Sequence, residues 1–207
     1  MDLSRPFGTV TPTVDGDVLS ALAGAETVFT PAQLHRVVGR HSESGIRKSL
    51  ARLVRQGVVT QQRIGAGFVY GLNREHLSSP SIVTMSRLRA EFLRRLAERF
   101  ASFDAPPVFA AIFGSAARGE MRPDSDIDLF VVHESTVTDE WFDALDQLAD
   151  DASRWTGNDV RAVAFSEDEL LEQLCGEDPL LSEIRRDGLV VWGNPSCLRA
   201  SKVTRRA

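Results

Sequence analysis

Two short runs of residues could hold a phosphate group and a metal ion. The first, Gly114-Ser115, follows an apolar run that reads as a strand and precedes an expected helix. Glycine lets the backbone approach a ligand closely, and the amides at a helix N-terminus are donors for phosphate. The second run carries Asp126 and Asp128, which point to one face of a strand. Such a pair can bind one divalent ion, or two ions about 3.5–4 Å apart, to clamp a triphosphate and activate an attacking hydroxyl.

The spacing of these two runs resembles that of one known superfamily. Ten residues separate Ser115 from Asp126, and the surrounding segments are Arg118-Gly119-Glu120 and Ser125-Asp126-Ile127-Asp128-Leu129. They resemble the minimal bacterial members of the DNA polymerase β-like nucleotidyltransferases over roughly residues 105–193. The resemblance implies a small mixed sheet with helices on one face. It also implies transfer of a nucleoside monophosphate from an NTP, with ATP expected, in the presence of Mg²⁺ or Mn²⁺.

The resemblance extends to the roles of single residues. It implies that Gly114 and Ser115 contact the triphosphate, with Arg118 as a further contact to the phosphates. It implies that Asp126 and Asp128 are the catalytic metal ligands.

The sequence departs from the superfamily pattern at the third carboxylate, which usually comes from the next strand. Arg161 stands where that acid is expected, in the run Val160-Arg161-Ala162-Val163. Asp159 lies two residues earlier on the same strand face, about 7 Å away at about 3.3 Å per residue, and a register shift would make it the third catalytic acid. Otherwise Arg161 would pair with Asp126 or Asp128 and weaken catalysis. The prediction of an enzyme therefore depends on the third carboxylate.

The elements expected around these residues alternate between strands and helices. Apolar runs predict the strands, and helical periodicity predicts the segments between them. Alternation of this kind indicates an α/β or α+β fold. Strands are expected at residues 108–113, 127–132, 160–165 and 189–192, and helices at 138–155, 167–174 and 179–186.

The N-terminal part of the chain has the pattern of a smaller domain. A short helix ends at Gly24, a second begins at a capping box formed by Thr30 and Gln33, and a third begins at the cap Ser42. Three helices followed by a two-stranded wing is the order of a winged helix-turn-helix, and the segment resembles the winged-helix domains of bacterial transcription regulators. The two strands are expected at residues 58–62 and 68–72.

The charge of the chain is divided unevenly between the two parts. The net charge is −5, yet residues 31–75 carry eight Lys or Arg against two acids, and residues 101–192 carry 21 acids against six arginines. Such asymmetry indicates one part that meets a polyanion and another that repels it.

DNA is the polyanion that a basic winged helix predicts. The third helix is expected to enter a major groove and present Ser44, Arg47 and Lys48, while Arg63 in the wing reaches phosphate or the minor groove. A homodimer is expected, because most such domains bind DNA as dimers. The alternative is a winged helix used only for protein contacts.

Together these patterns predict an α/β (α+β) chain of two domains joined by a long helix. The expected divisions are a flexible tail at 1–14, a winged-helix domain at 15–76, a linking helix at 77–103, a nucleotidyltransferase domain at 104–195 and a tail at 196–207.

Several classes of protein are disfavoured. No apolar run approaches the roughly 20 residues of a membrane helix, and the N-terminus lacks the basic start and apolar stretch of a secretory signal. Cys175 and Cys197 are too few for a disulfide scaffold and are not spaced as a zinc site. A cytoplasmic protein without a membrane partner is therefore expected.

Three functions remain open. The first is a DNA-binding, metal-dependent nucleotidyltransferase with a regulatory role, acting on an unidentified acceptor such as a protein or a small molecule. The second is a transcription regulator whose degenerate transferase domain only senses nucleotides. The third is a toxin–antitoxin component. The presence or absence of the third carboxylate distinguishes the first from the second.

Overall fold

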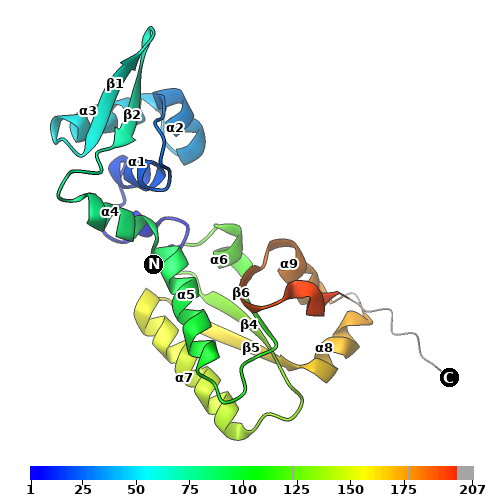
Figure 1. Cartoon of the computed structure of the whole chain (residues 1–207). Helices are drawn as coiled ribbons and strands as arrows, with labels where there is room; N and C mark the ends of the chain where they lie inside the picture. Colours follow the sequence, from blue (N-terminus) through cyan, green and yellow to red (C-terminus); the bar gives the residue numbers. More distant parts are fainter. Residues whose placement is uncertain (123, 177, 200–207) are drawn as a thin grey trace. The chain divides into compact units, whose positions relative to one another are not determined.

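The computed structural model describes residues 1–122, 124–176 and 178–199 of the 207-residue chain (Figure 1). The chain forms two compact units. One comprises residues 2–90, and the other comprises residue 1 together with the chain from Glu91 onward. Among the described residues, no helix combines the length and the apolar character needed to cross a membrane.

The first unit is built from helices and one antiparallel hairpin. Its elements are η1 (Pro6–Thr9), α1 (Val14–Ala23), α2 (Pro31–Val38), α3 (Glu43–Arg55), β1 (Val59–Ile64), β2 (Gly67–Leu72) and α4 (Ser79–Ser86). The hairpin pairs Val59 with Leu72 and turns after Ile64. An isolated antiparallel bridge between Phe29 and Tyr70 joins the segment before α2 to the hairpin. The expected order of three helices and two strands is confirmed.

Local signals in the sequence set the ends of α2 and α3. The Thr30 hydroxyl accepts the Gln33 backbone N–H, and the Gln33 side chain accepts the Thr30 N–H, which confirms the capping box. The Ser42 hydroxyl accepts the backbone N–H of Gly45 at 3.2 Å, which confirms the second cap. The apolar faces of the helices then meet in one core, which includes Val18, Leu22, Leu34, Ile46, Leu50 and Leu53.

The N-terminal segment, expected to be a flexible tail, is instead packed into the first unit. Phe7 is only 4% exposed and joins the core formed by α1 and α3. Burial of its aromatic ring removes apolar area from water and stabilises the first unit. The Thr- and Pro-rich segment around Phe7 has no apolar periodicity that would predict this burial.

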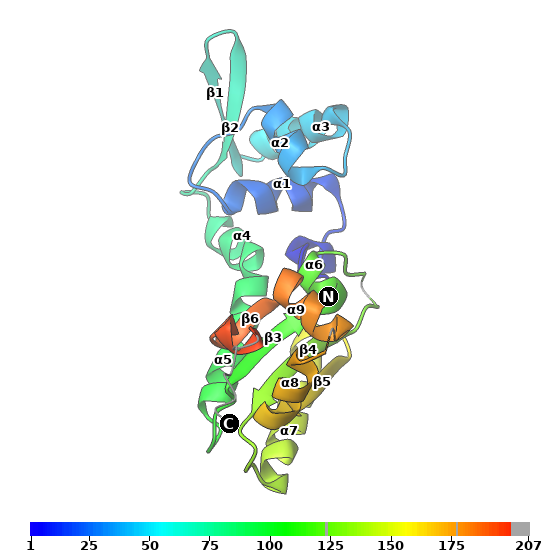
Figure 2. The same ribbon diagram turned by 90° about the vertical axis from the view of Figure 1, so that its right-hand side faces the viewer.

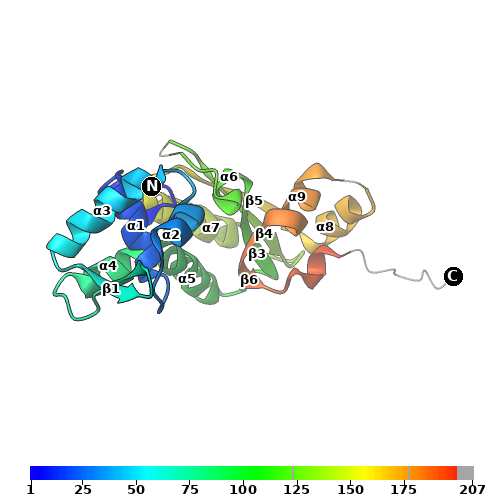
Figure 3. The same ribbon diagram turned by 90° about the horizontal axis from the view of Figure 1, so that it is seen from above.

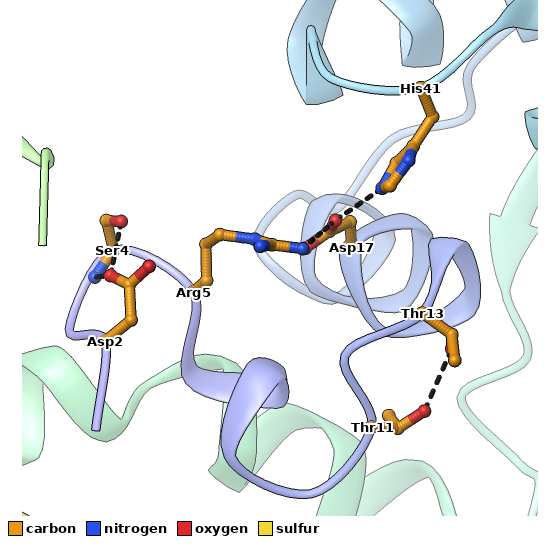
Figure 4. A network of polar contacts seen from close by, with 7 residues as sticks. All are labelled: Asp2, Ser4, Arg5, Thr11, Thr13, Asp17 and His41. Atoms are coloured by element: carbon orange, nitrogen blue, oxygen red, sulfur yellow. Dashed lines mark hydrogen bonds and ion pairs between the residues drawn. The ribbon is translucent and has the colours of Figure 1, made fainter. Parts of the chain in front are cut away.

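A polar network fastens this segment to the helices (Figure 4). Arg5 donates from Nε and Nη2 to the two carboxylate oxygens of Asp17 in α1, at 3.1 and 2.6 Å. His41, in the loop between α2 and α3, lies 2.7 Å from Asp17 Oδ2 through Nε2. Burial alone would raise the pKa of Asp17, but the hydrogen bonds from Arg5 and His41 lower it below its ordinary value. Asp17 therefore joins three segments of the first unit as a carboxylate.

The expected linking helix is two helices, α4 and α5 (Leu88–Ala101), separated at Arg87. In an unbroken helix the Arg87 N–H would bond to the carbonyl of Val83. That carbonyl instead accepts the hydroxyl of Ser86 at 2.8 Å, and the Arg87 N–H turns to the carbonyl of Thr84. The serine competes with the backbone and ends the helix, an effect that apolar periodicity does not show.

The second unit is a four-stranded sheet with helices. After α5 come β3 (Phe109–Phe113), α6 (Gly114–Arg118), β4 (Ile127–His133), α7 (Asp139–Thr156), β5 (Val160–Ser166), α8 (Glu167–Leu174), α9 (Pro179–Asp187), β6 (Leu189–Gly193) and η2 (Pro195–Leu198). The strand order is β5-β4-β3-β6. The β4–β5 pair is parallel and the other two pairs are antiparallel, so the predicted mixed sheet is confirmed.

Helices cover both faces of this sheet, not one face as the resemblance implied. Helices α5 and α7 lie on one side and α8 and α9 on the other, as Figures 1, 2 and 3 agree. On the α8/α9 side, Phe109 and Phe130 of the sheet pack against Leu170, Leu181 and Leu198. Leu198 is 1% exposed and Cys197 packs against the same core, so the start of the expected tail at 196–207 is anchored, and residues 200–207 lie outside the described residues.

We predict that Asp17→Asn lowers the free energy of unfolding of the first unit by about 1–2 kcal/mol at pH 7, because it removes a charged acceptor shared by two donors in a partly exposed site. The folded-state pKa of Asp17 lies below its unfolded value, so its contribution is present above the unfolded pKa and is lost as pH falls through the folded pKa. The difference between variant and wild type should disappear in acid.

Urea titrations followed by far-UV circular dichroism and by tryptophan fluorescence test this. Trp141, Trp155 and Trp192 all belong to the second unit, so the fluorescence transition should stay in place while the dichroism transition moves. Glu26→Gln, at an exposed position of the same unit, is the matched control. An Asp17→Asn transition that coincides with the control at pH 7 would contradict the assignment.

Candidate functional site

The pairing of strands gathers charged side chains on one face of the second unit. Phe113 at the end of β3 pairs with Asp128 in β4, and Asp128 pairs with Arg161 in β5. Side chains alternate along each strand, so Asp126 shares the face of Asp128, and Asp159 shares that of Arg161. Phe130 of β4 and Phe165 of β5 point to the same face as these charged residues. Both pack in the core that the sheet forms with α8 and α9, so this is the face that α8 and α9 cover.

A tight turn presses the backbone against one of these carboxylates. Gly114 has φ +70°, and a Cβ at this position would lie 2.7 Å from Asp128 Oδ2. The positive φ favours glycine, and a side chain at this position would force the Asp128 carboxylate to shift. The turn opens the short helix α6, which places half-buried Ser115 directly after the point of closest approach. The structure thus brings together the two runs that the sequence predicted to act jointly.

Asp128 stands in an excess of negative charge. Burial raises its pKa first, Asp126 raises it further, and Glu183 adds to the effect, while Arg161 opposes it. The charged form of Asp128 is therefore costly, and a cation beside it would relieve that cost.

Arg161 is tied to the aspartates at the ends of the strands. Its Nη1 lies 2.9 Å from Asp126 Oδ2, and its Nη2 lies 2.9 Å from Asp159 Oδ2. The pairing of β4 with β5 runs without a shift from Ile127–Val160 to the end of the strand. The register shift needed to bring Asp159 level with Asp128 is absent, so Asp159 instead binds Arg161, and 58% of its side chain is exposed.

Arg118 is also held by two carboxylates. Its Nε donates to Glu120 Oε2 at 2.9 Å, and its Nη1 pairs with Glu183 of α9. Sequence reasoning placed residue 183 on an expected helix but assigned it no role. No local signal in the sequence could have assigned a role to Glu183. Glu183 lies 65 residues after Arg118, and the two side chains meet only because α9 packs beside α6.

A buried side-chain amide is hydrogen-bonded to the backbone that leads into β4. Asn158 is 5% exposed, and its Nδ2 donates to the carbonyl of Ser125 at 2.8 Å. The Ser125 hydroxyl accepts the backbone N–H of Arg122, and the N–H of Ile127 donates to the carbonyl of Asp159. The backbone on both sides of Asp126 is therefore fixed by hydrogen bonds.

The residues present suit one divalent ion of the Mg²⁺ class. Asp126 and Asp128 offer the carboxylate oxygens that such hard cations prefer, and a cation would balance the charge around Asp128. Within the described ranges, no group of three His, Cys, Asp or Glu side chains is arranged to hold a metal. The chain therefore supplies two carboxylates, and further ligands would come from water and phosphate.

The basic residues predicted to meet DNA lie on α3 and the hairpin of the first unit. Ser44, Arg47 and Lys48 are exposed on α3, and Arg63 is exposed near the end of β1, opposite Phe68. Arg47 pairs with Glu43 one turn earlier at 2.6 Å.

Comparison with known proteins bears on the second unit. Residues 91–185 match the family model of the nucleotidyltransferase domain. No curated protein shows significant similarity to the chain. A toxin–antitoxin crystal structure with AMP-PNP is 20% identical over 52% of this chain and 76% of that chain, with a TM-score of 0.36. A mutant of the toxin–antitoxin complex MntA–HpeT is 18% identical over 51% and 76%, with a TM-score of 0.37. The matched residues include Gly114, both aspartates and Glu183, so this part of the second unit is similar to a nucleotidyltransferase domain.

Proposed function

We propose that the second unit binds a nucleoside triphosphate together with a divalent ion, and transfers a nucleoside monophosphate from it to an acceptor. The observation that carries this proposal is the turn at Gly114, whose positive φ favours glycine and whose backbone lies against the carboxylate of Asp128. A backbone this close to a carboxylate would bring contacts to phosphate beside the ligands of a metal ion. The family match over the same residues supports the same chemistry.

Each residue of this face has a part in the proposal. Asp126 and Asp128 would hold Mg²⁺ or Mn²⁺, which neutralises phosphate charge and activates the attacking hydroxyl when bound. Gly114 and Ser115 would bring backbone and hydroxyl groups to the triphosphate, with ATP as the expected nucleotide. Arg118 would contribute positive charge to the phosphates once released from its carboxylate partners.

A nucleotide sensor without transfer is the second candidate function, and Arg161 favours it. Its guanidinium occupies an oxygen of Asp126, while Asp159 is turned to Arg161 and not to the aspartate pair. A site without a third carboxylate lacks a base for the acceptor hydroxyl. Transfer of label from α-labelled ATP to an acceptor in a cell extract separates the candidates, because a sensor would bind ATP and transfer nothing.

We predict that Asp126→Asn with Asp128→Asn weakens Mg²⁺-dependent ATP binding by more than about tenfold, or about 1.4 kcal/mol. The amides keep the shape of the carboxylates but lose the charge that binds the ion. Calorimetric titration of ATP with Mg²⁺ into both proteins measures the effect.

The matched control is Asp146→Asn with Asp150→Asn, which removes the same charge from the exposed surface of α7. This control should bind as the wild type does. Failure of the wild-type protein itself to bind any NTP with Mg²⁺ or Mn²⁺ would overturn the enzyme and the sensor together.

We predict that Arg161→Ala increases the affinity of the second unit for Mn²⁺ a few-fold, because the guanidinium no longer competes for Asp126. Electron paramagnetic resonance of free Mn²⁺ during a titration measures this. Arg154→Ala, at an exposed position of α7, is the control for the lost positive charge and should bind Mn²⁺ as the wild type does. Equal affinities for all three proteins would show that Arg161 does not restrain the metal ligands.

We propose that the first unit is a winged helix that binds DNA through α3 and the β1–β2 hairpin. The supporting observation is that Ser44 and Lys48 on α3 and Arg63 on β1 are exposed, and the two cations have no acidic partner among the described residues. Arg47 would have to exchange Glu43 for a base or phosphate. A regulatory role would follow from joining DNA binding to a nucleotide-dependent domain, with a homodimer and a protein acceptor as the proposed partners.

We predict that Lys48→Ala with Arg63→Ala weakens DNA binding and lowers the slope of log affinity against log salt by about 2, since each phosphate contact contributes about one. Fluorescence anisotropy with a labelled duplex at several salt concentrations measures both quantities. Arg94→Ala with Arg154→Ala removes the same charge from α5 and α7 and should leave the slope unchanged. A slope that is equal in all three proteins would contradict DNA binding through α3 and the hairpin.

A further inference from the structure

We propose that Glu183 makes nucleotide binding dependent on the metal ion, by holding Arg118 away from any triphosphate that lacks one. This inference rests on the proposed nucleotide site and assigns to that site a residue from α9. Glu183 acts through Arg118 and is therefore a positioning residue.

The first step concerns the positive charges beside the aspartate pair. Arg161 is shared by Asp126 and Asp159, and Arg118 is shared by Glu120 and Glu183. Each guanidinium is thus shared by two carboxylates. With Asp128, five carboxylates accompany two guanidiniums in this cluster. The cluster is therefore negative although it contains two arginines.

The second step concerns how firmly Glu183 is placed. It lies between Leu181 and Ile184, which are 0% and 3% exposed and anchor α9 to the sheet. Its side chain is only 30% exposed, whereas that of Glu120, two residues after the end of α6, is 65% exposed. Packing therefore fixes Glu183, while solvent competes for Glu120.

The third step concerns what a nucleotide meets on this face. A triphosphate without a metal brings several negative charges toward carboxylates and finds both arginines occupied. With a divalent ion present, Asp126 and Asp128 would hold it, and its charge would offset part of the charge on the phosphates. Arg118 would then be able to exchange Glu183 for a phosphate oxygen. The face would therefore select metal-complexed nucleotide and reject the free form.

The experiment compares ATP affinity in excess Mg²⁺ with ATP affinity in EDTA. For Glu183→Gln we expect affinity in EDTA to rise by about fivefold or more, the order expected when one unit charge a few ångströms from phosphate is removed. Affinity in Mg²⁺ should change much less, so the ratio between the two conditions falls. A merely structural role for Glu183 would weaken binding in both conditions alike.

Two further variants make the result decisive. Glu172→Gln removes the same charge from an exposed position of α8 that makes no ion pair among the described residues, and it should leave the ratio unchanged. Arg118→Gln in the Glu183→Gln background should abolish the gain in EDTA. A gain that survives the loss of Arg118, or no gain in Glu183→Gln, would overturn the inference. Absence of wild-type binding in Mg²⁺ would instead overturn the proposed site itself.

Discussion

The register between β3 and β4 is the constraint on which the second unit depends. Phe113 pairs with Asp128, so the last apolar residue of one strand meets the first charged residue of the other. Because side chains alternate, a slip by one residue would turn Asp126 and Asp128 toward α5 and α7 and bury the charge against an apolar core. The buried residues of β4 exclude that slip. The same apolar packing that stabilises the sheet therefore keeps the carboxylates beside the Gly114 turn.

Much of this arrangement follows from short-range patterns in the sequence. Apolar runs and helical periodicity indicated the strands and most helices, and the capping groups at Thr30 and Ser42 lie where the sequence predicts them. That the Gly114-Ser115 run and the Asp126/Asp128 pair belong to one site could also be anticipated, because glycine, serine and alternating aspartates rarely occur in this order by chance. The strand, helix and cap signals are local to the segments that they describe.

The features that sequence reasoning missed depend on contacts between distant segments. Glu183 meets Arg118 only because α9 packs beside α6, and Phe7 is buried only because α1 and α3 offer it a core. The break at Arg87 depends on which carbonyl the Ser86 hydroxyl takes, a choice that periodicity cannot express. The sequence predicts that Arg161 pairs with an aspartate of the pair if no register shift occurs. Only the structure shows that β4 and β5 pair without a shift, and hence that Asp159 binds Arg161.

The pairing of β3 with β6 has a consequence for synthesis of the chain. β3 is the first strand of the second unit. Its two neighbours in the sheet are β4 and β6, and β6 is the last strand among the described residues. While the ribosome is still adding α7, α8 and α9, one edge of β3 has no partner, and Phe109 to Phe113 is an apolar edge that favours aggregation. β6 must pair with β3 before the four-stranded sheet is complete. This pairing can form only after β6 has left the ribosome, late in the synthesis of the second unit.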